Sequence, residues 1–210
     1  MRKQMTIPGS RGPAAASRKL LLLLPAVLLG GGGCLLSARS PEAPSKTNQV
    51  PYQPPTTMSL VLTNVQATFS AKVVDNYTRS LDPNFGFVPD PADESESGEL
   101  PSWWASWNKQ EEVQAFTNIL NQPSTVTINF SWGSANIATD PNNSNIQYYQ
   151  DLPYVMTLYK AQKDTVFSGK ADLYMVETNG LYSITKWVDK RDGSAHATLG
   201  LVRWKGSIQF

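Results

Sequence analysis

Few side chains of this 210-residue chain could carry acid-base or metal chemistry. The chain has one histidine, His196, and one cysteine, Cys34, which together cannot make a zinc site. It contains no phosphate-binding glycine loop, dinucleotide fingerprint or nucleophile elbow. His196 lies in the turn-like segment 192–197 and is predicted to be solvated, because a catalytic histidine needs a cleft and an orienting partner. We therefore expect neither a metal nor a cofactor.

Two aspartates remain as candidates for general acid-base catalysis. Asp75 and Asp172 lie closest to the faces of predicted elements, and each has a tyrosine nearby, Tyr77 or Tyr174, that could stabilise an oxyanion. An isomerase or cyclase would need such a carboxylate buried, with its pKa moved toward neutrality. Because carboxylates are rarely buried without a partner, both aspartates are also readily explained as surface charges.

Aromatic side chains are the richest remaining signal, since the chain has six tryptophans. Aromatic residues are enriched in ligand pockets and protein interfaces, but they also fill cores. The adjacent pair Trp103 and Trp104 is the best candidate for an exposed patch, because neighbouring side chains on one helix or strand cannot both face a core. The predicted pocket or patch comprises Trp103, Trp104, Trp107, Phe116, Tyr174 and Trp187.

The amino-terminal segment carries basic residues followed by an apolar run. Residues 2–19 hold five basic side chains and no acidic one, and residues 20–29 form a leucine-rich run too short to span a bilayer. Four glycines, residues 30–33, then precede Cys34. This pattern resembles the signal of bacterial lipoproteins, which implies a signal peptide over residues 1–33 and acylation of Cys34, for example by palmitate. An ordinary secretory signal with an incidental cysteine is the alternative.

Charge and proline content characterise the chain after Cys34. Thirteen basic and seventeen acidic residues follow it, and this mildly acidic balance argues against nucleic-acid binding. Residues 37–57 contain five prolines and almost no aliphatic side chains, so they cannot bury enough surface to fold alone. We therefore expect a proline-rich linker over residues 34–57 that holds a domain, residues 58–210, away from a membrane.

Hydrophobic spacing predicts helices in the first part of this domain. Apolar residues from Leu62 to Leu81 recur every three or four positions, which favours one long helix, although an alternating strand pattern is also present. Residues 89–99 are predicted to form a solvated acidic loop. Asn108 and Glu111 have the spacing of a capping box, which predicts a second helix that ends before Pro123.

From Ser124 onward the apolar period changes to two. The alternation predicts antiparallel strands, with a turn or loop at residues 140–145 and a last strand after the turn that holds His196. Asn179-Gly180 is the strongest hairpin signal in the chain. Helices followed by antiparallel strands give an α+β fold. The predicted strands lie near residues 124–132, 148–160, 166–176 and 181–188.

Several segments carry a family resemblance, namely Tyr77 to Leu81, Asn84 to Pro89, Trp107 to Glu112, Val166 to Tyr174 and Gly180 to Asp189. Together with the order of elements, they resemble the nuclear transport factor 2-like superfamily, especially its uncharacterised bacterial lipoproteins, over about residues 60–204. The resemblance implies a cone-like, cystatin-like roll in which a curved antiparallel sheet wraps around the N-terminal helices. It implies no single activity, because this fold hosts isomerases, cyclases, dehydratases and binding domains.

The sequence thus predicts a lipoprotein attached to the cell membrane or outer membrane through Cys34, facing the periplasm or the exterior. Its domain is expected to be non-catalytic and to bind a small apolar ligand or an envelope protein. An acid-base enzyme and a pure association domain that forms homodimers through its open sheet face are the alternatives. A hollow cone with a buried carboxylate would favour the enzyme, a hollow apolar cone would favour ligand binding, and a filled cone would favour association.

Overall fold

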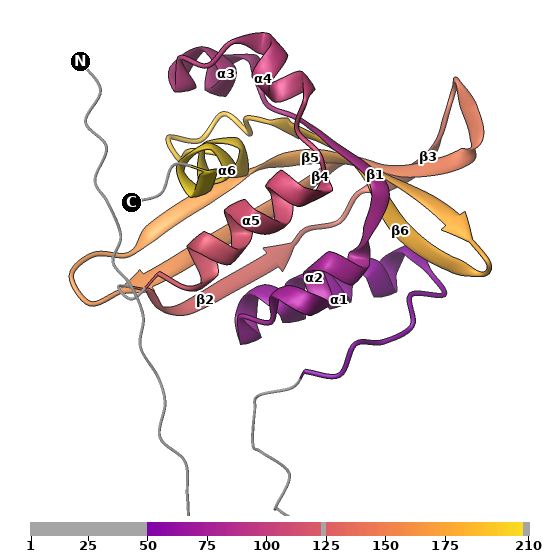
Figure 1. Cartoon of the computed structure of the whole chain (residues 1–210), viewed down its shortest axis with the longest axis horizontal. Coiled ribbons are helices and arrows are strands. Elements are labelled where there is room, and N and C mark those ends of the chain that lie inside the picture. The colour runs from indigo at the N-terminus through magenta and orange to yellow at the C-terminus, as the bar shows by residue number, and fades with distance from the viewer. Residues whose placement is uncertain (1–49, 123–124, 208–210) are drawn as a thin grey trace, which may run out of the picture. The chain divides into compact units, whose positions relative to one another are not determined.

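Most of the described helices lie on one face of a curved sheet, as the computed structural model in Figure 1 shows. The structure describes residues 50–122 and 125–207, which belong to one compact unit, Ser45–Phe210. The predicted signal peptide, Cys34 and most of the predicted linker lie outside the described residues. The elements are α1 (Met58–Ala71), α2 (Val74–Ser80), β1 (Leu81–Val88), α3 (Pro91–Ser97), α4 (Pro101–Ala105), α5 (Lys109–Leu120), β2 (Thr125–Trp132), β3 (Asn136–Asp140), β4 (Asn143–Lys160), β5 (Thr165–Thr178), β6 (Leu181–Lys190) and α6 (Leu199–Ser207).

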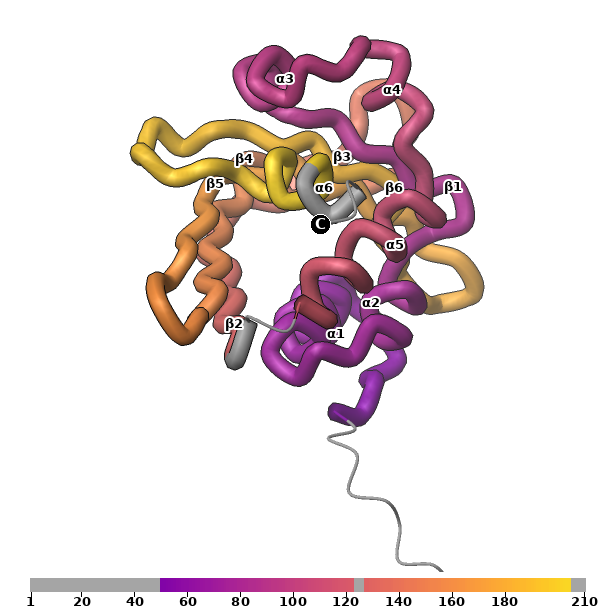
Figure 2. The backbone as a smooth tube through the Cα atoms, turned by 60° about the vertical axis from the view of Figure 1, so that its left-hand side comes forward, coloured from indigo at the N-terminus to yellow at the C-terminus, as the bar shows by residue number. Residues whose placement is uncertain are grey.

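The strands form one sheet in the order β1-β6-β5-β4-β2, and β3 pairs with β4. Neighbouring strands are antiparallel, except that β1 runs parallel to β6. Figure 2 shows the sheet curving around the helices, where α1 packs on β2 and α5 packs against α6. The predicted α+β class, with a curved antiparallel sheet around the N-terminal helices, is confirmed.

The predicted long helix is interrupted, and this part of the prediction is wrong. Helix α1 ends at Ala71, and the left-handed backbone of Lys72, with φ of 57°, lets its N–H bond to the carbonyls of Phe69 and Thr68. Val73 is then extended, so α2 begins on a new axis and Leu81 already belongs to β1. The apolar stripe still describes burial, because Phe69 and Leu81 both lie in the core.

The acidic segment after β1 is a helix rather than the predicted solvated loop. Asp90 caps α3 by accepting a hydrogen bond from the Ala92 N–H, and Pro91 occupies the first turn. Asp93 is fully buried, because the Arg191 guanidinium binds its carboxylate from the end of β6. A charge partner that lies 98 residues away in the chain therefore explains why this carboxylate is buried instead of solvated.

Local signals elsewhere predict the elements correctly. The capping box of Asn108 and Glu111 begins α5. Asn179 and Gly180 form the turn between β5 and β6 with φ of 53° and 77°. Alternate residues of β4 and β5 are buried as predicted, and they include Tyr154, Met156, Leu158, Ala171, Leu173 and Met175.

The predicted turn or loop at residues 140–145 is confirmed, because a turn at residues 141–142 joins β3 to β4. The strand predicted after His196 is wrong, because that segment forms helix α6. In β6 the alternation of Tyr182, Ile184 and Val188 predicts one inward face, but only Ile184 of these is buried. A bulge opposite Tyr174 and Met175 shifts the phase, so Trp187 and Asp189 point inward instead.

Gly169 of β5 lies so close to Tyr154 and Lys190 that the structure leaves no room for a side chain at this position. A Cβ atom at this position would overlap the Tyr154 hydroxyl and lie 2.7 Å from the Lys190 carbonyl oxygen. We expect Gly169→Ala to lower the free energy of unfolding by about 1–3 kcal/mol in urea denaturation, because overpacking displaces backbone. Gly86→Ala is the matched control, since a Cβ there meets nothing within 4 Å. Equal losses in both variants would contradict this account.

Candidate functional site

Aromatic rings fill the space between the helices and the sheet. Phe69 of α1 lies 4.7 Å from Phe130 of β2 and 5.0 Å from Phe116 of α5, measured between ring centroids. Tyr77 of α2 packs 5.1 Å from Phe116. These residues are fully buried, so side chains occupy the centre of the cone.

Glu112 is a fully buried carboxylate at the start of α5. Its Oε1 accepts a short hydrogen bond from the Tyr77 hydroxyl, and its Oε2 accepts one from Trp107 Nε1 at 2.8 Å. Arg203 Nε of α6 bonds to both oxygens, at 3.1 and 2.8 Å. The first turn of α5 also favours negative charge there through the helix dipole. Burial, and next the charge of Glu112, raise the pKa of Tyr77 well above its ordinary value, so the phenol remains a donor.

Arg203 carries the buried positive charge of this site. Its guanidinium carbon lies 4.0 Å from the ring centroid of Phe87 and 4.4 Å from that of Trp187, so the charge is held between aromatic faces. Among the described residues, its two Nη atoms have no hydrogen-bond partner. The ion pair with Glu112 and the aromatic faces are therefore what keep this arginine in the interior.

Asp189 is a second buried carboxylate, only 1% exposed, at the end of β6. It accepts hydrogen bonds from the Tyr154 hydroxyl at 2.6 Å and from the Gly200 N–H at 2.7 Å. The Leu199 N–H in turn donates to the Tyr154 oxygen at 3.0 Å. Burial raises the pKa of Asp189 to about 6, while the charge of Arg203 acts in the opposite direction.

Asp93 of α3 completes the attachment of α6. Its carboxylate accepts two hydrogen bonds from Arg191, at 2.9 and 2.6 Å, and a short one from the Thr198 hydroxyl. The Thr198 oxygen also accepts from the Gly200 N–H at 3.1 Å. Two buried aspartates, Asp93 and Asp189, thus hold the first turn of α6, and Arg203 holds its middle.

The structure places most of the predicted aromatic patch in the core. Trp104, Trp107, Phe116 and Trp187 are buried, so the prediction of an exposed patch at Trp103 and Trp104 is wrong. Trp103 is partly buried because its ring packs edge-on against Trp104 at 4.6 Å and Trp107 at 5.3 Å. The three tryptophans form a cluster because α4 is short and the chain turns back after it.

Tyr174 lies elsewhere, on the outer face of the sheet. Its ring stacks on that of Tyr148 at 4.6 Å, and Lys186 Nζ lies 5.4 Å from its centroid. Tyr174 and Trp107 both line a surface pocket of about 340 Å³ near β1. The six predicted aromatic residues therefore do not form one site.

The predicted acid-base residues are not brought together either. Asp75 is exposed on α2. Asp172 lies on the outer face of β5, where its Oδ2 is 2.7 Å from Lys190 Nζ. Of the four residues in this hypothesis, only Tyr77 reaches the buried network.

The sequence patterns did not reveal the buried charged residues Glu112, Asp189 and Arg203. Glu112 lies next to the capping residue Glu111, and only its spacing of four from Phe116 marks the inward face of α5. Trp187 and Asp189 are two apart, which places them on one face of a strand once the bulge is known. Arg203 lies four residues after the apolar Leu199, a helical spacing in a segment predicted as strand.

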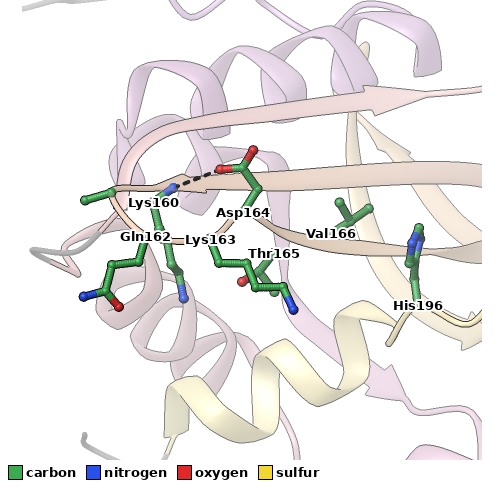
Figure 3. A pocket seen from close by; sticks show the side chains of 8 residues that line it. Lys160, Gln162, Lys163, Asp164, Thr165, Val166 and His196 are labelled. Atoms are coloured by element: carbon green, nitrogen blue, oxygen red, sulfur yellow. Dashed lines mark hydrogen bonds between the residues drawn. The ribbon is translucent and has the colours of Figure 1, made fainter.

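His196 is exposed, as predicted, and precedes α6. It lines the rim of an open pocket of about 780 Å³ at the β4–β5 turn, which Figure 3 shows with Lys160, Lys163 and Asp164. In the part of the chain that the structure describes, no three histidine, cysteine or acidic side chains are grouped to hold a metal ion.

The raised pKa of Asp189 predicts how stability depends on pH. The folded chain holds this proton up to about pH 6, whereas the unfolded chain releases it near 3.8. The free energy of unfolding should therefore fall by up to about 3 kcal/mol as the pH rises through this window, and stay lower above it. Asp189→Asn should lack this fall in urea denaturation. The exposed control, Asp75→Asn, should keep it, and identical pH profiles of the two variants would contradict the assignment.

No family model matches the chain, and no curated protein matches it. Solved structures are similar to it, among them a proposed aromatic ring hydroxylase from Novosphingobium aromaticivorans (11% identity, TM-score 0.52, 73% of this chain and 99% of that chain). Naphthalene 1,2-dioxygenase with indole bound in its active site matches at 11% identity and TM-score 0.50, over 69% and 81%. A protein of unknown function from Mycobacterium tuberculosis matches at 10% and 0.50, over 71% and 85%. At such identities the likeness concerns architecture alone, and the chain has the cone-shaped fold of nuclear transport factor 2-like proteins.

Proposed function

We propose that this chain is a lipoprotein of the cell envelope, anchored by acyl chains on Cys34, whose domain binds a partner and catalyses no reaction. The domain would face the periplasm or the exterior. The closed, charge-paired interior of the cone is the observation that carries the non-catalytic part. The leucine-rich run and the glycines before Cys34 support the anchor.

Glu112 and Asp189, two of the three buried carboxylates among the described residues, accept their hydrogen bonds from protein groups. Glu112 accepts from Tyr77, Trp107 and Arg203, and Asp189 accepts from Tyr154 and the Gly200 N–H. A general base must come within hydrogen-bond distance of a substrate proton. Here α6 covers both groups, because its own residues Leu199, Val202 and Arg203 are buried, Arg203 binds Glu112 and the Gly200 N–H binds Asp189. This arrangement favours a structural role for the carboxylates and a binding function for the outer surface.

The outer face of the sheet is suited to contact an envelope protein. Tyr148, Tyr174 and Lys186 form a cross-strand row there, and Val155 is 43% exposed on the same strand as Tyr148. Tyrosine is enriched in protein interfaces relative to the rest of the surface. With the interior filled, a protein partner fits better than a small apolar ligand inside the cone. A homodimer through this face is the alternative arrangement, which sedimentation mass distinguishes.

The anchor is tested by Cys34→Ser. In the parent cell type, the wild-type chain should fractionate with membranes and incorporate labelled palmitate. The variant should lose the label and become soluble, because it lacks the acylated sulfur and, among the described residues, no helix is long and apolar enough to cross a membrane. Ser37→Ala is the matched control and should behave as wild type. Membrane association that survives Cys34→Ser without label would refute the anchor.

An acid-base enzyme remains a second candidate, and one observation favours it. Asp189, with a pKa raised to about 6, donates or accepts a proton near neutrality and is bonded to the Tyr154 hydroxyl. Glu112 and Tyr77 form a second carboxylate-phenol pair. For either pair to meet a substrate, α6 would have to leave its place on α5.

Hydrogen exchange distinguishes the two functions. If the domain is non-catalytic, the amides of Leu199 to Arg203 should exchange about as slowly as those of β5, because α6 is part of the core. Thr198→Val is the comparison variant, since it removes the hydroxyl bound to Asp93 with little change of shape. It should speed exchange in α6 while β5 stays protected. Fast exchange of α6 in the wild-type chain would support the enzyme instead.

A further inference from the structure

The segment Val50–Thr57, part of the predicted linker, forms neither helix nor strand and lies at the lower right of the domain in Figure 1, where it is drawn in indigo. The segment leads directly into α1, because its last residue, Thr57, is the N-cap of that helix. We call Val50–Thr57 the strap. Its contacts with the domain run mainly through its own main chain.

Two buried asparagines bind the strap from the helices. Asn64 of α1, 3% exposed, accepts from the Gln53 N–H at 3.0 Å and donates to the Gln53 carbonyl at 2.7 Å. One amide thus satisfies both backbone groups of one strap residue. Asn76 of α2, 6% exposed, donates to the Val50 carbonyl at 2.9 Å. Buried amides need partners, and here the strap backbone supplies them.

The sheet and Arg79 bind the other side of the strap. The Tyr182 N–H at the start of β6 donates to the Pro55 carbonyl at 2.8 Å, before β1 begins to pair with β6 at Ile184. The Tyr52 hydroxyl donates to the Arg79 carbonyl at 3.3 Å, and the Arg79 guanidinium lies 5.7 Å from the Tyr52 ring. The strap therefore bridges α1, α2 and β6.

The geometry points to a binding site, formed by α1, α2 and the first residue pair of β6, for an extended proline-rich segment of the same chain. The site binds main-chain groups of the strap through Asn64, Asn76 and the Tyr182 N–H. It therefore recognises the conformation of the strap backbone more than particular side chains. Pro51, Pro54 and Pro55 favour that conformation before binding, which lowers the entropy lost on docking. We propose that residues Val50–Thr56 of the strap dock and detach as a unit, while Thr57 continues to cap α1 and the rest of the domain stays folded.

The strap is suited to detach because little apolar surface holds it. Pro55 is buried and Tyr52 partly so, whereas Pro51, Gln53, Pro54, Thr56 and Thr57 are exposed. After detachment, Asn64 and Asn76 would meet water, which replaces the lost hydrogen bonds. The aromatic centre around Phe69 and Phe116 does not include the strap. Segments of this kind open at a lower free energy than the global fold.

Detachment would change how far the domain stands from its anchor, a consequence that rests on the proposed function. With the strap docked, the domain begins at Val50, 16 residues after Cys34 in the sequence. Releasing Val50–Thr56 adds seven residues, or about 23 Å of reach when extended. The strap would thus act as a length reserve that brings the outer sheet face to partners at different heights.

Hydrogen exchange on the full chain, in detergent micelles, tests the strap directly. The amides of Gln53 and Tyr182 report docking, because their acceptors are Asn64 and Pro55. In the wild type, both should be protected, but less than β5. Asn64→Leu should lower their protection about tenfold or more, since the clamp on Gln53 is lost. Protection in β5 should stay unchanged.

Asn118→Leu is the matched control, because it replaces a helical asparagine on α5 that accepts from Gln114. It should leave Gln53 and Tyr182 as in the wild type. Unprotected strap amides in the wild type would show that the strap does not dock. An equal loss in β5 for Asn64→Leu would show that it cannot detach separately. Either result overturns the proposal. The same measurement on soluble Cys34→Ser separates strap docking from failure of the anchor.

Discussion

The ion pair between Glu112 and Arg203 is the constraint on which the interior depends. Removing two charges from water costs several kcal/mol for each ion, so the pair is tolerable only with good geometry and further hydrogen bonds. Tyr77 and Trp107 supply those bonds to Glu112, and two aromatic faces enclose the guanidinium. These partners come from α2, the segment before α5, β1, β6 and α6. The helices must therefore assemble together for either charge to be neutralised, and the cone closes as a result.

Two further buried carboxylates, one in β6 and one in α3, hold α6 in place. Asp189 of β6 and Asp93 of α3 bind its first turn through Gly200 and Thr198. Arg191 neutralises Asp93 at the surface end of the same network. The bulge in β5 and β6 matters for this reason, because it turns Asp189 inward at the level of α6. The bulge between β5 and β6, the docking of α6 and the pairing of the buried charges therefore depend on one another.

Local sequence patterns correctly predicted the elements whose structure is determined by interactions between neighbouring residues. Alternating apolar residues predicted β4 and β5, the capping box predicted the start of α5, and Asn179-Gly180 predicted the last hairpin. Each of these signals depends only on neighbouring residues. The prediction failed where distant residues decide. Asp93 is buried because Arg191 reaches it, and Trp104 is buried because Phe87 of β1 packs against it. Glu112 and Arg203 had no local signal strong enough to outweigh the rule that charges lie at the surface.

The cost of opening the interior bears on what the domain can do. Displacing α6 would leave Glu112 without its cation, and breaking a buried pair by removing one partner typically costs about 3–5 kcal/mol. The open state would then be populated at roughly one part in a hundred to one in several thousand, before the burial of Leu199 and Val202 is counted. A catalyst that works only in the open state would lose that factor in rate. A partner that binds the outer face needs no such opening, and this difference supports the proposal that the domain binds a partner.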